Sequence, residues 1–462
     1  MFKRKSLLLV LVMILLVNLI IFSGCTQKSQ QEAKNVTLDD EKKSEVKVIT
    51  TEELKKRLNE DNLILVDIRS SAQYNGWKLE GEKRSGHIKG AVDFPYSWIK
   101  DKKLKDEDIK RILKSKGVTT EKTVVVYDAR GKNVQDMANI LRSLGYENVL
   151  IYNSGIVEWS KDESLPMESL KNYEKLVHPK WINDLINGKK PDTYNNDKYV
   201  IFEVSWGPPK DYKKGHIPGA IHLDTNLIEE EPLWNRVSDE KIKKVLEDYG
   251  VTYDTTVILY GADTMAAARA ASIMMYAGVE DVRLLDGGFN AWVNAGYQVE
   301  KEVRMPQPVD DFGIEVPAHP EYIIDIEEAK QILKDENALL VSIRSWDEYI
   351  GKTSGYSYIK PKGRIAGAVW GHAGSDPYHM QDYRNIDNTM RNYHEIAKNW
   401  EEWGITPDKK IAFFCGTGWR ASEAFFYAYL MGWENISVYD GGWYEWSMDE
   451  SNPVEFGDPR QN

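Results

Sequence analysis

The sequence predicts an α/β protein made of three tandem copies of one domain, each a parallel sheet flanked by helices. Three segments repeat the same spacing of Gly, Gly and Trp behind an apolar strand. Continuous apolar strands also alternate with helical stretches, a pattern typical of a parallel sheet covered on both faces. The chain has 462 residues, enough for about three domains of roughly 150 residues.

The repeat is measured from the residue that follows each apolar strand, namely Asp128, Gly261 or Cys415. From each of these residues a Gly follows at +17, a second Gly at +27 and a Trp at +31. The period is far longer than the 20–45 residues of a solenoid repeat, so each copy is a whole domain. The apolar strands that precede the three residues are 123–127, 256–260 and 410–414.

Further matched segments set the domain boundaries. Each copy opens with a strand-like run (65–69, 201–205 and 340–344), followed by a Gly-(His/Arg)-Ile-x-Gly-Ala segment (86–91, 215–220 and 363–368). Residues 303–320 hold four prolines, which is typical of a stiff linker. The predicted domains are 49–170, 178–302 and 321–458.

The N-terminus is typical of a targeting segment. A basic start, Lys3 to Lys5, precedes an apolar run that is short for a membrane span, as in a secretory signal peptide. Phe22-Ser23-Gly24-Cys25 resembles the lipobox of bacterial lipoproteins, with Phe22 where Leu is usual. We therefore expect a signal peptide at 1–25, lipidation of Cys25, and a location on the extracytoplasmic face of the bacterial membrane; an uncleaved membrane anchor is the alternative. The polar stretch 26–48 is predicted to be a flexible tether.

Composition excludes several classes of protein. The net charge is −12, so the chain lacks the basic surface that binding to a nucleic acid needs. Cys25 and Cys415 are the two cysteines of the chain, which excludes a disulfide-stapled scaffold.

The segment that begins at Cys415 is the main candidate for chemistry. It runs from an apolar strand through Gly416-Thr417-Gly418-Trp419-Arg420 into a stretch, 423–430, that is predicted to be helical. A glycine-rich loop of this kind can turn its backbone N–H groups inward, and the following helix adds its positive end. Both effects stabilise a thiolate at Cys415, and Arg420 adds a fixed positive charge that can orient an anion. A buried, inert thiol is the alternative interpretation.

Taken together, these motifs resemble the rhodanese (thiosulfate sulfurtransferase) family over roughly residues 49–457. The motifs are an Asp-x-Arg strand, the Gly-His-Ile-x-Gly-Ala segment, an Asp-Gly-Gly turn before a Trp, and Cys-x4-Arg after a strand. The resemblance implies that Cys415 takes sulfur from thiosulfate as a persulfide and gives it to cyanide or a thiol. It implies no cofactor and no metal, and it leaves Asp128 and Gly261 in domains without a catalytic cysteine.

Other functions remain open at this point. The loop also resembles that of mercaptopyruvate sulfurtransferases. A non-catalytic sulfur carrier or redox sensor would use the same cysteine. Protein tyrosine phosphatases use Cys-x5-Arg, so the shorter loop here favours sulfur transfer.

Further residues of the third domain are candidates for the site. Arg344 and Arg364 lie in segments that run near the active cleft in tandem rhodaneses, so we expect both to bind substrate. Trp370 and Trp419 are candidates for the pocket wall, and the segment 371–393 has no counterpart in the other copies and could fold over the site. Its His372, Asp376 and His379 match no standard spacing of metal ligands.

Overall fold

The computed structural model describes residues 46–101 and 103–461. The predicted signal peptide and lipidation site lie outside this range. The predicted tether needs a correction at its end, because Val46 is buried and Lys47–Val48 form the first strand, so residues 46–48 belong to the folded body. Within the described residues, every helix is too short or too polar to cross a membrane.

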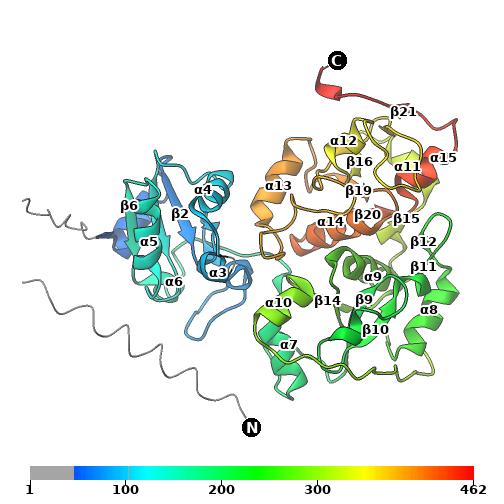
Figure 1. Ribbon diagram of the computed structural model, residues 1–462, viewed down its shortest axis with the longest axis horizontal. Helices are drawn as coiled ribbons and strands as arrows, with labels where there is room; N and C mark the ends of the chain where they lie inside the picture. The colour runs from blue at the N-terminus through cyan, green and yellow to red at the C-terminus, as the bar shows by residue number, and fades with distance from the viewer. Residues whose placement is uncertain (1–45, 102, 462) are drawn as a thin grey trace, which may run out of the picture. The chain divides into compact units, whose positions relative to one another are not determined.

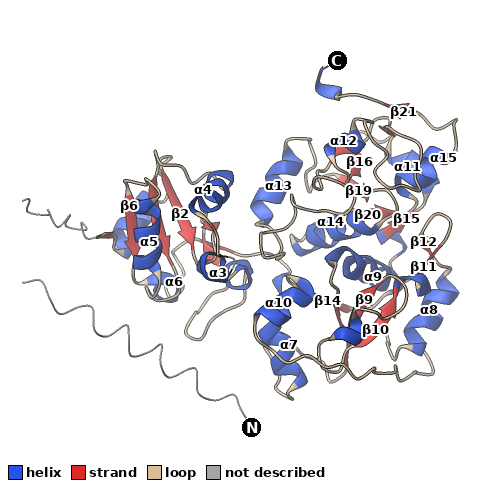
Figure 2. Ribbon diagram, viewed as in Figure 1, coloured by secondary structure: helices blue, strands red, loops and turns tan. Residues whose placement is uncertain are grey.

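Each of the three domains contains a five-stranded parallel sheet with helices packed on it, as predicted (Figure 2). The order of strands is the same in all three sheets: the domain's first strand lies at one edge, then its fifth, fourth, second and third. In spatial order the sheets are β1 (Lys47–Val48), β6 (Val149–Tyr152), β5 (Thr123–Tyr127), β2 (Leu63–Asp67) and β4 (Val92–Asp93); β8 (Leu176–Val177), β14 (Asp281–Leu285), β13 (Thr256–Tyr260), β9 (Tyr199–Ser205) and β10 (Ile221–Asp224); and β15 (Ile323–Ile324), β20 (Ile436–Tyr439), β19 (Lys410–Phe414), β16 (Ala338–Ser342) and β18 (Val369–Trp370).

The central strands are β5, β13 and β19, which coincide with the three apolar runs of the repeat. They lack charged residues, apart from Lys410 at the start of β19, because they are covered on both faces. The helices of the first domain are α1 (Thr51–Arg57), α2 (Ser71–Asn75), α3 (Tyr96–Asp101), α4 (Asp106–Ser115), α5 (Val134–Ser143) and α6 (Gly155–Trp159). Those of the second are α7 (Pro179–Ile186), α8 (Asp239–Asp248), α9 (Thr264–Ala277) and α10 (Gly288–Asn294), and those of the third are α11 (Ile326–Ile332), α12 (Trp346–Tyr349), α13 (Tyr393–Glu401), α14 (Trp419–Leu430) and α15 (Gly442–Met448).

Short two-stranded sheets complete the domains. The first and third domains each have one in the same place, and the second has a single antiparallel bridge there, between His216 and Glu300. A further hairpin in the second domain reaches the candidate site. These pairs are β3 (His87–Ile88) with β7 (Met167–Glu168), β17 (Arg364–Ile365) with β21 (Val454–Glu455), and β11 (Glu229–Glu230) with β12 (Asn235–Arg236).

The second and third domains share one hydrophobic core. Helices α9 and α14 pack against each other at its centre, and every residue of α9 is buried (Figure 1). The hydroxyls of Ser272 and Ser422 are 3.0 Å apart across this contact. Apart from Arg269, whose charge is paired with Glu229 and Asp440, α9 carries no charged residue. A helix with apolar residues on all sides must be buried, so the pairing of α9 with α14 holds the two domains together.

The first domain has cores of its own and meets the third domain through polar contacts. Lys116 is almost fully buried, and its Nζ contacts Asp93 of its own domain at 2.8 Å and Glu395 of the third at 2.7 Å. The indole of Trp98 donates a hydrogen bond to Asp387 at 2.7 Å.

Candidate active site

Cys415 lies immediately after β19, at the carboxyl end of the central strand of the third domain. Helix α14 begins at Trp419, earlier than the predicted 423, so Trp419 and Arg420 form its first turn. Gly418 precedes the helix with φ +110°, a conformation that favours glycine. The N-terminal end of a twelve-residue helix therefore points at the loop of Cys415.

The repeated Gly at +27 has a structural reason. A side chain on Gly442 would place its Cβ 2.7 Å from the carbonyl oxygen of Cys415, and the next residue, Trp443, donates its backbone N–H to that oxygen at 2.8 Å. In the second domain the equivalent Gly288 lies equally close to the carbonyl of Gly261. The turn after the fifth strand thus supports the loop after the fourth strand in each copy, and this contact requires the fixed spacing.

The loop directs backbone N–H groups at the position of the Cys415 side chain. The backbone N–H of Gly418 donates to Cys415 Sγ at 3.2 Å. In the first domain the equivalent loop binds the carboxylate of Asp128. This carboxylate accepts hydrogen bonds from the backbone N–H groups of Arg130, Gly131 and Asn133 at 2.9, 2.5 and 2.9 Å. The loop after the fourth strand therefore binds an anion in the first domain, and in the third domain it surrounds the side chain of Cys415.

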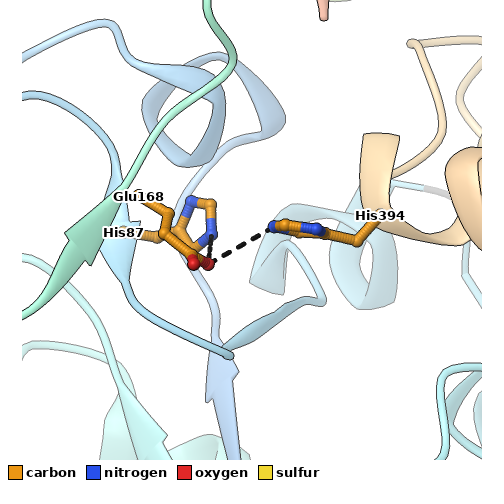
Figure 3. Close-up of side chains that lie close together, drawn as sticks. All are labelled: His87, Glu168 and His394. Atoms are coloured by element: carbon orange, nitrogen blue, oxygen red, sulfur yellow. Dashed lines mark ion pairs between the residues drawn. The ribbon is translucent and has the colours of Figure 1, made fainter. Parts of the chain in front are cut away.

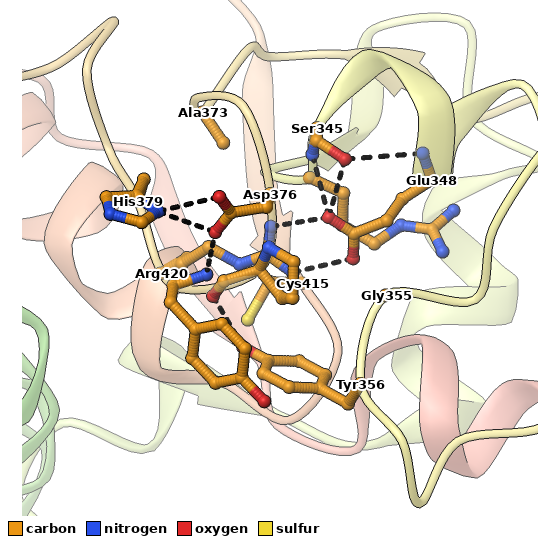
Figure 4. A network of polar contacts seen from close by, with 12 residues as sticks. Ser345, Glu348, Gly355, Tyr356, Ala373, Asp376, His379, Cys415 and Arg420 are labelled. Carbon is orange, nitrogen blue, oxygen red and sulfur yellow. Dashed lines mark hydrogen bonds and ion pairs between the residues drawn. The ribbon is translucent and has the colours of Figure 1, made fainter.

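Buried charges surround Cys415, which is itself fully buried (Figure 4). Arg420 contacts Glu348 in two places at 2.9 Å, and both side chains are completely buried. Burial opposes the charged forms, but this pairing raises the pKa of Arg420 above its ordinary value and lowers that of Glu348. Arg344 is also buried, and burial together with the charge of Arg420 lowers its pKa to about 10. Two buried cations thus face one buried carboxylate beside Cys415.

Each of the three arginines that were predicted to bind substrate contacts other groups of the protein. Arg420 is directed to Glu348 and stacks over the ring of Tyr356, with its Nε unpartnered among the described residues. Arg344 donates to the carbonyl of Gly363 at 2.7 Å. Arg364 contacts Glu455 at 3.0 Å and the carbonyl of Gly457, so its cation is already paired. Substrate binding by Arg344 and Arg364 stays a prediction.

A cavity of about 700 Å³ lies beside the loop, between the second and third domains. Thr417 and Trp419 line it from the loop, and Pro377 and Tyr378 line it from the segment 371–393. Trp370 does not line it and instead packs against Trp346 and His372. The remaining aromatic and acidic lining residues are Trp206, Trp234, Tyr356, Tyr358, Tyr444, Glu229, Glu231 and Asp263.

The cavity wall is aromatic and acidic, and neither Lys nor Arg is among its lining residues. Glu229 is buried, and both of its oxygens accept from the Trp419 indole, at 2.8 and 3.0 Å. Burial raises the pKa of Glu229, and Arg269 at 3.1 Å opposes that shift. The second domain, which has Gly261 at the position of Cys415, thus supplies one wall of the cavity.

Sequence reasoning missed Glu348, Tyr356 and the acidic wall. A buried Arg needs a counter-charge, but 72 residues separate Arg420 from Glu348 and nothing in the sequence pairs them. Tyr356 leaves no space at Gly416, where an added Cβ would lie 2.4 Å from its ring. The Gly at this position is the one signal that could have indicated a close neighbour. The chain has 15 tryptophans, and nothing in the sequence distinguishes Trp206 and Trp234 from the others.

The candidate metal ligands of 371–393 do not converge. His379 pairs with Asp376 at 2.7 Å, whereas His372 faces Asp382 at 3.8 Å. That this segment contributes no metal site stays a prediction.

Comparison with known proteins gives consistent results. The model of the rhodanese-like domain matches residues 50–162, 178–295 and 325–449. The chain is 47% identical over 403 residues to thiosulfate sulfurtransferase YnjE of Escherichia coli, which covers 87% of this chain and 91% of that protein. It is 31% identical over 293 residues to the sulfur carrier protein TtuD of Thermus thermophilus, which covers 62% of this chain and 98% of that protein.

Solved structures of EanB share the fold. Wild-type EanB has a TM-score of 0.86 and 43% identity, and the match covers 90% of this chain and 98% of that one. A variant of EanB that carries a cysteine persulfide, in a complex with ergothioneine, also has a TM-score of 0.86 and 43% identity, over 89% of this chain and all of that one. Because three domain matches, a close curated relative and the loop around Cys415 all agree, the protein belongs to the rhodanese family and is a sulfurtransferase that carries sulfane sulfur on a cysteine.

Proposed function

We propose that Cys415 takes a sulfane sulfur from thiosulfate and passes it to an acceptor that binds in the cavity between the second and third domains. In the first step the Cys415 thiolate attacks the outer sulfur of thiosulfate. The S–S bond of the donor breaks, sulfite leaves with the bonding electron pair, and a persulfide anion remains. In the second step the acceptor attacks the outer sulfur and Cys415 returns to the thiolate, so that cyanide gives thiocyanate.

The observation that carries this proposal is the anion-binding loop around a cysteine. Gly418 N–H points at Cys415 Sγ, and the buried Arg344 and Arg420 outnumber the single carboxylate of Glu348. The same loop holds a carboxylate in the first domain. Groups that are fixed in this way stabilise the negative charge of a persulfide without reorganisation, in the manner of an oxyanion hole.

The cavity favours an acceptor that is aromatic, cationic or both. Glu231 and Asp263 give its wall negative charge, and Trp206 and Tyr378 are each 62% exposed at this site. Aromatic faces and carboxylates attract organic cations, quaternary ammonium groups above all. Thiosulfate is a small anion, so we assign it to the loop and assign the wider cavity to the acceptor.

A second candidate function follows from the cavity. Structures of EanB are described as complexes with hercynine and with ergothioneine. Hercynine is a trimethylammonium betaine with an imidazole ring, which suits an aromatic and acidic wall. In this reaction the outer sulfur of the persulfide would replace hydrogen on the ring carbon, and Cys415 would leave as the thiol, so that atoms balance.

The decisive experiment uses the chain from Gln27 onward, without the predicted signal peptide. Thiocyanate formation from thiosulfate and cyanide is measured for the wild type and for Cys415→Ser, and intact-protein mass spectrometry follows the gain of one sulfur atom. We expect many turnovers and a sulfur-loaded wild type, and neither for the variant. Stoichiometric release would instead support a carrier or sensor, and activity with 3-mercaptopyruvate alone would change the donor.

The acceptor is tested separately with the sulfur-loaded protein. Hercynine, cyanide and dithiothreitol are compared at equal concentration, and the products are identified by mass spectrometry. Formation of ergothioneine would support the second candidate. A preference for dithiothreitol, together with no product from hercynine, would contradict it.

We also propose that the protein is held on the extracytoplasmic face of the membrane by lipid on Cys25. The lipobox-like Phe22-Ser23-Gly24-Cys25 and the polar residues after it support this proposal. The test expresses the full chain and its Cys25→Ser variant in bacteria that are fed an alkyne-tagged fatty acid. Labelling of the wild type alone is expected, and equal labelling or none would refute lipidation.

A further inference from the structure

Two histidines and a glutamate converge where the first domain meets the third. His87 lies in β3 and Glu168 lies opposite it in β7, while His394 comes from α13 of the third domain (Figure 3). Glu168 Oε2 is 4.0 Å from His87 Nε2 and 3.4 Å from His394 Nε2. One ligand atom from each of the three residues lies within 4.8 Å of the other two.

His87 is arranged as a metal ligand would be. Its Nδ1 is 2.9 Å from the carbonyl oxygen of Tyr74, which can only accept, so Nδ1 carries the proton and Nε2 has a free lone pair. Nε2 is buried and has no hydrogen-bond partner among the described residues. A backbone carbonyl that orients a histidine through its other nitrogen is the usual second shell of a metal site.

The other domains provide an internal comparison. In the second domain His216 stacks on Tyr212 and faces Glu300 at 4.0 Å, as His87 stacks on Tyr74 and faces Glu168. There Arg304 pairs with Glu300. In the third domain Arg364 replaces the histidine and pairs with Glu455. The His–Glu pair thus occurs in the first and second domains, and among the described residues a third ligand meets the pair of the first domain alone.

We propose that His87, Glu168 and His394 bind one Zn²⁺ ion, which links the first domain to the third. Two imidazoles and one carboxylate are ligands that zinc prefers, and a water molecule would complete a tetrahedron. Ligand atoms around such an ion are roughly 3.3 Å apart, given Zn–N and Zn–O distances of about 2.0–2.1 Å. The Glu168–His394 distance of 3.4 Å fits this value, and the Glu168–His87 distance of 4.0 Å is somewhat longer.

The charges around the site are compatible with a cation. Lys89 Nζ is 3.5 Å from the other oxygen of Glu168, but the Lys89 side chain is 65% exposed and can turn into solvent. Gly90 donates its backbone N–H to Glu168 Oε2 at 3.3 Å, a contact that holds the carboxylate near the histidines.

The resemblance to the family implies no metal, and the sequence does not indicate a shared site for positions 87, 168 and 394, because they are far apart and lie in two domains. The ion would add a strong link to a junction that otherwise depends on polar contacts such as that of Lys116 with Glu395. The inference does not depend on the sulfurtransferase site, since none of the three residues lines the cavity beside Cys415.

The test measures zinc binding by the untagged chain from Gln27 onward, after dialysis against a chelator. Competition with a chromogenic zinc indicator gives stoichiometry and affinity, and thermal unfolding gives the shift in Tm. We expect one Zn²⁺ per chain and a rise in Tm with added zinc. His394→Gln and Glu168→Gln are expected to weaken binding at least about tenfold and to abolish the Tm shift.

Matched controls keep the test specific. Glu300→Gln alters the equivalent pair of the second domain, and His379→Gln removes an exposed histidine of the third domain; both are expected to bind zinc as the wild type does. His394 is 49% exposed, so its replacement should leave the fold intact, which circular dichroism checks. Absence of binding by the wild type, binding that survives His394→Gln, or loss of binding in a control would each overturn the proposal.

Discussion

Glu348 and Arg420 form a fully buried ion pair with two contacts of 2.9 Å, beside the loop that carries Cys415. Glu348 comes from α12 and Arg420 from the first turn of α14, so the pair connects two elements that flank the same sheet. Arg344 lies close enough for the charges of Glu348 and Arg420 to shift its pKa. The charge that Cys415 experiences is therefore set by three side chains together.

Removal of the carboxylate should destabilise the protein strongly. Glu348→Gln leaves the Arg420 cation buried without its counter-charge, and we expect a loss of about 3–5 kcal/mol in the free energy of unfolding. Urea unfolding measures this change. The neighbouring Asp347→Asn removes an exposed pair with Lys352 and should cost less than about 1 kcal/mol. Equal costs for the two variants would show that Arg420 is not held by Glu348.

Arg344 should act on the reactivity of the cysteine through its charge. Arg344→Met removes one of the two buried cations near Cys415, so the thiolate is less stabilised and should react about tenfold more slowly with methyl methanethiosulfonate at pH 7. The rate of persulfide formation from thiosulfate should fall in parallel. Arg460→Met, which removes a cation that is 61% exposed, serves as the control. A raised KM for thiosulfate with an unchanged thiol reactivity would assign Arg344 to substrate binding instead.

The aromatic wall should matter for large acceptors and not for small ones. Trp206→Ala removes an exposed ring at the cavity, and we expect KM for an aromatic or quaternary ammonium acceptor to rise about tenfold. The rate with cyanide should stay as it is, because cyanide needs no aromatic wall. Phe456→Ala removes an equally exposed ring outside the cavity and should change neither value. A loss with both acceptors would point to a distorted loop.

Asp286 should make stability depend on pH. Burial, with the charge of Asp387 added, raises its pKa from 3.8 to about 8, while the backbone N–H of Met390 donates to it at 2.7 Å. The folded chain thus binds this proton more tightly than the unfolded chain does. The resulting stability is complete below about pH 4 and is lost as the pH rises through 8.

Asp286→Asn keeps the acceptor oxygen and removes the charge, and the first domain has Asn153 at this position. Relative to the wild type, the variant should gain stability as the pH rises from 4 to 8, up to roughly 5 kcal/mol. Thermal unfolding at pH 4.5 and at pH 8.5 measures the difference. A constant difference between the two proteins across this range would show that Asp286 does not titrate there.

Much of the fold was accessible from the sequence because it is repeated. The three strands that precede Asp128, Gly261 and Cys415 were located correctly, since central parallel strands are continuous apolar runs. The Gly at +27 recurs at a fixed spacing because only Gly fits against the carbonyl of the loop in every copy. The start of α14 was predicted too late. Trp419 and Arg420 follow a glycine-rich segment and were assigned to the loop, whereas Gly418 is the residue that precedes the helix.

The sequence by itself determined the family and the three α/β domains, because these depend on local patterns that recur along the chain. It also singled out Cys415 as the candidate cysteine. Only the tertiary structure decided which side chains surround that cysteine. Glu348, Tyr356 and Glu229 reach the site from distant positions, and two of the three domains share its cavity. Contacts between side chains far apart in sequence depend on how sheets and helices pack. Such packing does not produce a recurring pattern in the sequence.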